Sequence, residues 1–327
     1  MKRFLKVLAV LAVLLGVLFL VFRTPDTDAA EMRAKYGSEA SQFVELRGGQ
    51  TFHLRDEGPR DAPVVMLIHG ANSSLHTWDV WTDQLKDNFR VVRFDTAGHG
   101  LTGPAADGEY TKARYVADID AIADHLGLDT FVIAGNSMGG WMATSYAIAH
   151  PERVSGLALL NASGAPRIEG EGQLYLGAIL ASMPVVHNLM TSITPRSLVK
   201  SSYKGAVADP AVITEEKVDR YWELLRYPGN RQAVLDRSNT PRGGPFDTGD
   251  IAALTMPALV MWGDEDKVTP PSGADWYEEH LPNDRAIRYP DVAHVPMEEI
   301  PERSAADLRG WIEDAVVEPA TEAVDTP

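Results

Sequence analysis

The chain has 327 residues, no cysteine, and a formal net charge of −16 from 46 acidic residues against 30 Lys and Arg. This length accommodates one large domain or two modest ones. The acidic excess argues against a nucleic-acid partner, and the lack of cysteine excludes disulfides, thiol nucleophiles and thiolate metal sites.

Residues 1–23 predict a membrane-directed segment. Lys2, Arg3 and Lys6 accompany the start of a run, residues 7–22, that is apolar apart from Gly16. Such a run fits a signal peptide or an uncleaved signal anchor, which would be a transmembrane helix. Residues 24–30 offer only a weak cleavage site, so we favour the anchor. The basic residues before the run place the rest of the chain on the extracytoplasmic side, or in a secreted or periplasmic form if the segment is cleaved.

A regular alternation of strands and helices follows a polar linker at residues 24–40. A hairpin is expected around Gly48-Gly49. Strands are predicted at 63–68, 90–94, 130–135 and 154–161, and helices at 75–87, 112–126 and 138–149. This repetition predicts a mostly parallel central sheet flanked by helices, with ligands at the carboxyl ends of the strands. We assign this core to residues 41–165 and 247–318, and a disordered acidic tail to 319–327.

The alternation breaks at residues 166–246, which we interpret as a helical cap inserted after the sixth strand. Helix-like stretches at 174–190 and 215–226 carry many of its apolar residues. An insertion at this point would roof a site at the strand ends. Most of the first stretch should pack within the cap, and Met183, Leu189 and Met190 are the candidates for lining a substrate pocket.

The run Gly135-Asn136-Ser137-Met138-Gly139 joins a predicted strand to a predicted helix. This is the Gly-x-Ser-x-Gly pattern in its strand–turn–helix setting. Small residues on both sides permit a turn so tight that the serine is strained and its hydroxyl stands clear of the sheet. We take Ser137 as the candidate nucleophile. The alternative is an ordinary turn serine.

A serine nucleophile needs a base, and the base needs a third group to orient it. In the fold of this motif the order along the chain is Ser, acid, His. His294, in a loop after a short strand, is the candidate base. Asp264, Glu265 and Asp266 follow the strand-like run 258–262 and compete for the role of acid. We choose Asp266, because a Gly-x-x-Asp loop at this point is where the fold presents its acid.

An acyl-transfer site also needs two N–H donors for the oxyanion. One is expected from the backbone of Met138, directly after the nucleophile, and the second from Ala71 in the loop after strand 63–68. His69 should brace that loop through hydrogen bonds, and Asp95 should form a turn. The sequence contains neither metal-ligand spacing nor a phosphate-binding glycine loop, so we expect no metal and no cofactor.

Together these residues resemble the α/β-hydrolase superfamily, in the branch that carries a lid or cap. The matching stretches are 69–78, 94–100, 135–140, 262–266 and 293–296, within residues 41–318. Ala97 is a departure, since the family usually has proline at that turn. The resemblance is nearest to serine esterases, lipases and carbon–carbon bond hydrolases. Ser137 separates the chain from haloalkane dehalogenases and epoxide hydrolases, whose nucleophile is Asp.

The resemblance implies an α/β-hydrolase fold and a serine hydrolase that cleaves carboxylic esters with apolar acyl or alcohol groups. One alternative is hydrolysis of carbon–carbon bonds in vinylogous diketones, the products of ring cleavage. That group typically has tryptophan where Val295 follows His294, and a Ser-Gly-Pro-Gly loop that is absent after Gly70. The same pattern also fits a cofactor-free perhydrolase or haloperoxidase, and a non-enzymatic binding module with a vestigial site.

Overall fold

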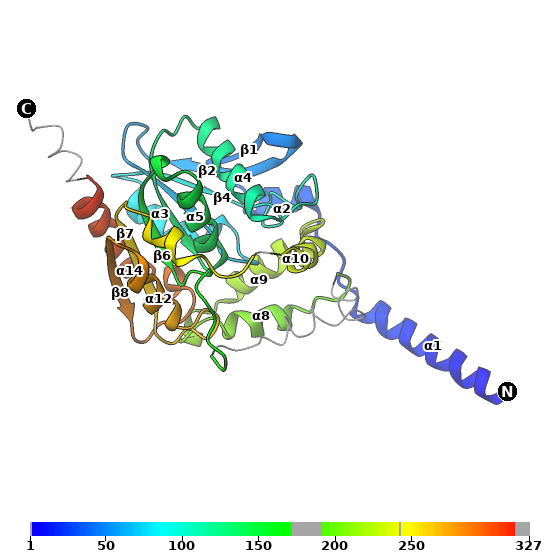
Figure 1. Cartoon of the computed structure of the whole chain (residues 1–327). Helices are drawn as coiled ribbons and strands as arrows, with labels where there is room; N and C mark the ends of the chain where they lie inside the picture. The colour runs from blue at the N-terminus through cyan, green and yellow to red at the C-terminus, as the bar shows by residue number, and fades with distance from the viewer. Residues whose placement is uncertain (1, 172–190, 242, 318–327) are drawn as a thin grey trace, which may run out of the picture.

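The computed structural model describes residues 2–171, 191–241 and 243–317 (Figure 1). The pocket residues expected from the sequence, Met183, Leu189 and Met190, lie outside the described residues, as does the expected tail at 319–327.

The core is a mostly parallel sheet, as the sequence predicts. Within the described residues eight strands follow the order β1-β2-β4-β3-β5-β6-β7-β8. Only the pairings of β1 with β2 and of β2 with β4 are antiparallel in this sheet. The strands are β1 (Ser41–Glu45), β2 (Thr51–Glu57), β3 (Val64–Ile68), β4 (Arg90–Phe94), β5 (Phe131–Asn136), β6 (Val154–Leu160), β7 (Ala258–Gly263) and β8 (Asp284–Tyr289). The carboxyl ends of the parallel strands therefore meet at one edge.

Helices cover both faces of this sheet. The longer ones in the core are α3 (Asp79–Leu85), α4 (Lys112–His125), α5 (Met138–Ala149), α12 (Ser272–His280) and α14 (Pro301–Ile312). Shorter helical turns are η1 (Arg47–Gly49), η2 (Leu75–Trp78), η3 (Pro151–Arg153), η4 (Pro210–Val212), α13 (Pro296–Glu299) and the π-helical η5 (Glu313–Val317). This arrangement places the central strands between two layers of helices, which is why β3, β5, β6 and β7 are largely apolar in sequence.

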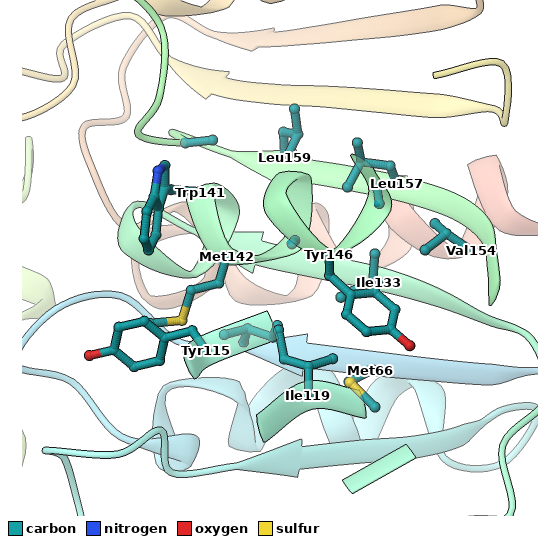
Figure 2. Close-up of a cluster of buried hydrophobic side chains, with 14 of the residues drawn as sticks. Met66, Tyr115, Ile119, Ile133, Trp141, Met142, Tyr146, Val154, Leu157 and Leu159 are labelled. Carbon is teal, nitrogen blue, oxygen red and sulfur yellow. The ribbon is translucent and has the colours of Figure 1, made fainter. Parts of the chain in front are cut away.

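Strand alternation divides the core into two clusters. Met66 and Ile68 of β3 pack in one cluster with residues of α4 and α5, which Figure 2 shows around Tyr115, Trp141 and Tyr146. Val65 and Leu67 point to the opposite face and pack with residues of α3 and α14. Because successive side chains of a strand point to opposite faces, one apolar strand contributes to both layers. The sheet is thereby held rigidly beneath its carboxyl edge.

The chain leaves the sheet after β6 and returns at β7, as expected for an inserted cap. The described helices of this region are α8 (Arg196–Lys204), α9 (Glu215–Leu225), α10 (Asn230–Asn239) and α11 (Thr248–Ala252). The first turn of α9 is capped by Thr214, whose side chain accepts a hydrogen bond from the Lys217 amide. Its amphipathic pattern buries Val218 and Leu224. We call residues 191–241 the cap.

The range expected to be a polar linker, residues 24–40, is packed against the cap. It contains the helix α2 (Ala29–Tyr36), whose Met32 is buried with Leu101, Leu224 and Tyr227. The Thr24 amide donates to the Ser192 carbonyl at 2.8 Å. The prediction of a linker from polar composition was therefore wrong. The segment buries one methionine and forms backbone hydrogen bonds to the folded cap.

The transmembrane helix expected at residues 1–23 is not confirmed. A helix, α1 (Lys2–Phe22), does extend away from the body of the molecule (Figure 1). Within the described part of the chain, however, no helix is both long enough and apolar enough to cross a membrane.

Candidate active site

Ser137 lies on a strained turn between β5 and α5. Its backbone has φ 55° and ψ −117°, a conformation that L-residues rarely adopt. A Cβ on Gly135 would collide with the carbonyl of Gly139, and a Cβ on Gly139 would collide with the carbonyl of Ile68. Glycine is therefore required on both sides of the serine, and this requirement is the physical basis of the sequence pattern.

The amide of Met138, the expected oxyanion donor, lies at the first residue of α5. The first amides of a helix have no partner within the helix and point along its positive end. The Ser137 carbonyl accepts hydrogen bonds from Trp141 N at 3.1 Å and Ser163 N at 2.9 Å. These contacts hold the serine at the start of the helix, where a developing negative charge is favoured.

The second expected donor, Ala71, follows a glycine that lies against the serine turn. A Cβ added to Gly70 would lie 3.2 Å from Ser137 Cβ and 2.8 Å from Asn136 Oδ1. Ala71 itself is exposed. The loop that contains Ala71 is thus brought beside Ser137, because only glycine allows that approach.

His69 braces this loop from below. Its ring is fully buried, with Nδ1 donating to the Gly70 carbonyl at 2.8 Å and Nε2 accepting from Thr96 N at 3.1 Å. Burial lowers the pKa of His69, so the ring is neutral. With both nitrogens in use, His69 supports the loop in the way the sequence predicts.

The expected base and acid are hydrogen-bonded to each other. His294 Nδ1 lies 2.8 Å from Asp266 Oδ2, and both side chains are buried. Asp264 and Glu265 are exposed, and Asp264 pairs with Arg288 on the surface. Of the three carboxylates after β7, the fold brings Asp266 to the histidine. Because Nδ1 of His294 is hydrogen-bonded to Asp266, Nε2 is the nitrogen of His294 that can take a proton.

Two residues outside the predicted site hold Asp266 in place. Asn161 Nδ2 and Thr269 Oγ1 each donate to Asp266 Oδ2 at 2.7 Å, and the Val268 amide donates to Oδ1 at 2.7 Å. Burial alone would raise the pKa of Asp266, but the charge of His294 and the hydrogen bonds from His294, Thr269 and the Val268 amide lower it below its usual value. Asn161 directly follows β6 at the carboxyl edge, and that position was the available signal.

The loop that carries His294 is tied to the serine turn and to the cap. Asn136, the residue before Ser137, donates from Nδ2 to the His294 carbonyl at 2.9 Å. The His294 amide donates to the Ala206 carbonyl of the cap at 3.0 Å. The turn, the histidine loop and the cap therefore share direct hydrogen bonds.

Asp95 organises the segment that follows the oxyanion loop. Its buried carboxylate accepts from Leu75 N at 2.7 Å, from Leu101 N at 2.8 Å and from His53 Nδ1 at 2.8 Å. Burial would raise the pKa of Asp95, but His53 and neighbouring histidines hold it well below its usual range. This agrees with the turn-forming role expected from the sequence.

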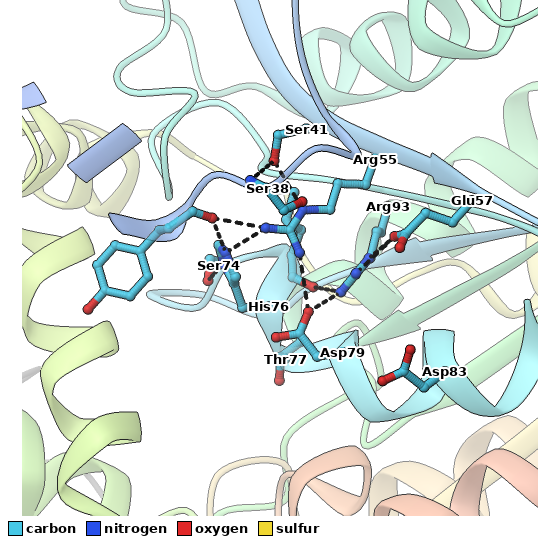
Figure 3. A network of polar contacts seen from close by, with 12 residues as sticks. Ser38, Ser41, Arg55, Glu57, Ser74, His76, Thr77, Asp79, Asp83 and Arg93 are labelled. Atoms are coloured by element: carbon cyan, nitrogen blue, oxygen red, sulfur yellow. Dashed lines mark hydrogen bonds and ion pairs between the residues drawn. The ribbon is translucent and has the colours of Figure 1, made fainter. Parts of the chain in front are cut away.

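A polar network continues outward from this segment. Figure 3 shows Arg55 and Arg93 converging on Asp79, beside His76. Arg93 also donates to the Leu75 carbonyl at 3.2 Å, which fixes η2 at its first residue. In the described part of the chain, no group of three or more His, Asp or Glu side chains is arranged to hold a metal ion.

Comparison with known proteins shows which family the chain matches. A family model described as "alpha/beta hydrolase fold" matches residues 63–301. The chain is 26% identical over 280 residues to the 2-hydroxymuconate semialdehyde hydrolase of Pseudomonas putida, covering 83% of this chain and 93% of that protein.

Solved structures share the fold. A membrane phospholipase A, described as a bacterial virulence factor, superposes with a TM-score of 0.74 and 23% identity, covering 96% of this chain and 99% of that one. The carboxylesterase CesB of Bacillus subtilis superposes with a TM-score of 0.71 and 20% identity, covering 91% of this chain and 98% of that one.

Proposed function

The chain belongs to the α/β-hydrolase family, and on that basis we propose that it is a serine hydrolase that cleaves carboxylic esters with apolar acyl or alcohol groups. The observation that carries the proposal is the buried hydrogen bond between His294 and Asp266, beside the strained turn of Ser137. A nucleophile, an oriented base and two backbone donors at one edge of a sheet are the parts that acyl transfer requires.

In the proposed mechanism Ser137 Oγ attacks the ester carbonyl while His294 Nε2 takes its proton. Asp266 keeps the imidazole in the tautomer that frees Nε2 and stabilises the imidazolium that forms. The amides of Met138 and Ala71 donate to the oxyanion, and His294 then protonates the leaving alcohol. Water, activated by the same histidine, hydrolyses the acyl-enzyme and restores Ser137.

Hydrolysis of a carbon–carbon bond is the second candidate, because the sequence also resembles the carbon–carbon bond hydrolases and a relative matched over most of the chain is named a 2-hydroxymuconate semialdehyde hydrolase. The same three side chains serve both reactions. Val295 after His294 and the sequence Ala71-Asn72-Ser73-Ser74 differ from the pattern typical of the carbon–carbon hydrolases. We therefore favour ester hydrolysis over carbon–carbon bond hydrolysis.

The test uses the full chain in detergent beside Ser137→Ala, on p-nitrophenyl esters from acetate to palmitate and on a coloured ring-cleavage dienoate. We expect ester turnover that peaks at one chain length and is lost in Ser137→Ala. Turnover of the dienoate without ester turnover would establish the second candidate. Failure of a fluorophosphonate to label Ser137 would contradict both.

The location of the protein is a separate proposal that rests on residues 1–23. We infer that this segment directs the remaining chain out of the cytoplasm, as an anchor or as a cleaved signal. Fractionation of cells that make the full chain or residues 24–327 tests it. The two forms should separate into different compartments, and an identical distribution would contradict the proposal.

A further inference from the structure

One buried carboxylate lies where the cap meets the core. Glu298 belongs to α13, four residues after His294, and its side chain is 3% exposed. Burying a carboxylate is costly unless donors and charges surround it. The contacts of this glutamate therefore show what holds the two parts of the molecule together.

Four hydrogen-bond donors converge on Glu298, and the Lys217 ammonium lies 3.8 Å from its Oε2. Oε1 accepts from Thr77 Oγ1 at 2.7 Å, from the Tyr221 hydroxyl at 2.8 Å and from the Arg220 guanidinium at 3.2 Å. Oε2 accepts a short hydrogen bond from the Tyr203 hydroxyl. Thr77 belongs to the core, whereas Tyr203 lies on α8 and Arg220 and Tyr221 lie on α9. The carboxylate thus joins two cap helices to two segments of the core.

The electrostatics fit an ionised carboxylate. Burial would raise the pKa of Glu298, but the charge of Arg220 and the hydrogen bonds from Tyr203 and Thr77 lower it. Burial and the negative charge of Glu298 raise the pKa of Tyr203 and of Tyr221, so both phenols remain protonated donors. Each partner is satisfied only while the cap is seated, because displacement of α8 and α9 would leave buried polar groups unpaired.

Both core segments at this junction lead to the candidate active site. Glu298 follows the histidine loop, and the neighbouring Glu299 accepts from Ala293 N at 3.0 Å and from Ala208 N of the cap at 2.7 Å. Thr77 belongs to η2, which follows the oxyanion loop. Tyr221 extends the network, since its hydroxyl lies 3.4 Å from Ser73 Oγ in that loop.

We propose that Glu298 is a positioning residue that seats cap helices α8 and α9 over the histidine and oxyanion loops and so sets the pocket for the apolar part of the substrate. The inference deepens the proposed function and rests on it. A seated cap shields a long acyl chain from water, whereas an acetyl group has little apolar surface for the cap to cover. Loss of the contact should therefore affect long substrates most.

The test compares the full chain with Glu298→Gln, Tyr221→Phe and their combination. Glu302→Gln is the matched control, because it makes the same chemical change at an exposed position of α14. Active sites are counted with a fluorophosphonate, and kcat and KM are measured for p-nitrophenyl acetate and octanoate. Hydrogen exchange of α8 and α9 provides a readout that needs no turnover.

We expect Glu298→Gln to raise KM for the octanoate roughly tenfold, the effect of losing one hydrogen bond to a charged group. The loss of turnover for the acetate should be much smaller than that for the octanoate, and amide protection should fall in α8 and α9. Tyr221→Phe should act in the same direction with a smaller effect. The increase in KM for the octanoate, expressed as free energy, should be smaller in the double variant than the sum of the two single variants, since the two residues share one contact.

Equal losses for both esters, or unchanged KM and unchanged exchange in α8 and α9, would overturn the proposal. If Glu298→Gln does not fold, Tyr221→Phe decides by the same two readouts. Absence of ester turnover in the unchanged chain would instead count against the proposed function. In that case the exchange of α8 and α9 still tests whether Glu298 seats the cap.

Discussion

Asn161 donates a hydrogen bond of 2.7 Å to Asp266, onto the same carboxylate oxygen that lies 2.8 Å from His294. Asn161 has φ 45°, and its side chain also contacts the Ala293 carbonyl at 3.2 Å and the Gly263 amide at 3.3 Å. An amide supplies both a donor and an acceptor, so one side chain spans the ends of β6 and β7 and the histidine loop. Asparagine also tolerates positive φ better than most residues.

Asn161→Asp should change the pH dependence of turnover. A second carboxylate beside Asp266 would make the pair share a proton, which raises the apparent pKa of the pair. The acid would then ionise only at a higher pH, so the acidic limb of kcat/KM should move to higher pH by about one unit. A pH–rate profile measures the shift. An unchanged acidic limb would mean that Asn161 does not face the acid.

Asp266→Asn and Asp264→Asn together test which carboxylate serves the base. Asp266→Asn should lower kcat by a factor on the order of 10³–10⁴, because an amide favours the wrong histidine tautomer. Asp264→Asn should change kcat little, because it removes only a surface ion pair with Arg288. Steady-state kinetics on one ester are sufficient. Comparable losses in the two variants would refute the choice of Asp266.

Ser137→Ala and Ser137→Gly should both lose turnover but differ in stability. Alanine retains the strain of φ 55°, whereas glycine tolerates positive φ. Strain of this kind costs about 1–3 kcal/mol, so the glycine variant should be more stable than the alanine variant by about 1 kcal/mol after its own entropy cost. Urea unfolding of the two inactive variants compares them directly. A less stable glycine variant would show that the turn carries no strain.

His76 should link folding stability to pH. Burial lowers the pKa of His76 from its ordinary 6.5 to about 4. The negative charges of Asp95 and Asp79 oppose this shift, and the positive charge of Arg55 favours it. Figure 3 shows His76 beside Arg55 and Asp79. Between these values the unfolded chain binds a proton that the folded chain does not. The stability that buried, neutral His76 contributes to the folded state is therefore fully present above about pH 6.5 and is lost as the pH falls toward 4.

His76→Gln should reduce the difference in unfolding free energy between pH 7.5 and pH 4.5 by about 2.5 kcal/mol. Urea titrations at the two values give that difference. His125→Gln, at an exposed position of α4, is the matched control. Equal pH dependence in the two variants would exclude His76 as the source.

Met32→Ala should destabilise the cap. Met32 is 3% exposed and packs against Leu101 of the core and against Leu224 and Tyr227. Removing a buried methionine side chain costs about 2–5 kcal/mol. Thermal unfolding and proteolysis of the cap measure the loss, with Glu31→Ala on the exposed side of α2 as control. If the two variants have equal stability, α2 does not support the cap.

Amino-acid order alone determined the features that depend on near neighbours. Apolar runs between helical segments predicted the parallel sheet, because a strand between two helical layers needs apolar side chains on both faces. Glycines at 135 and 139 predicted the serine turn, because only glycine fits the two backbones that approach there. The ends of strands likewise pointed to Ser137 and His294 as residues of one edge. The apolar run at residues 7–22 predicted a membrane span, but no helix in the described part of the chain is both long enough and apolar enough for one.

The tertiary structure decided every contact between distant segments. The Gly-x-x-Asp pattern favoured Asp266 among three adjacent carboxylates, but only folding brings that side chain to His294, 28 residues away. Asn161 reaches Asp266 across 105 residues, and Glu298 meets Thr77 across 221. Hydrogen bonds act over about 3 Å, so the partners of a side chain depend on its position in the folded sheet and cap. No local pattern in the chain records that position.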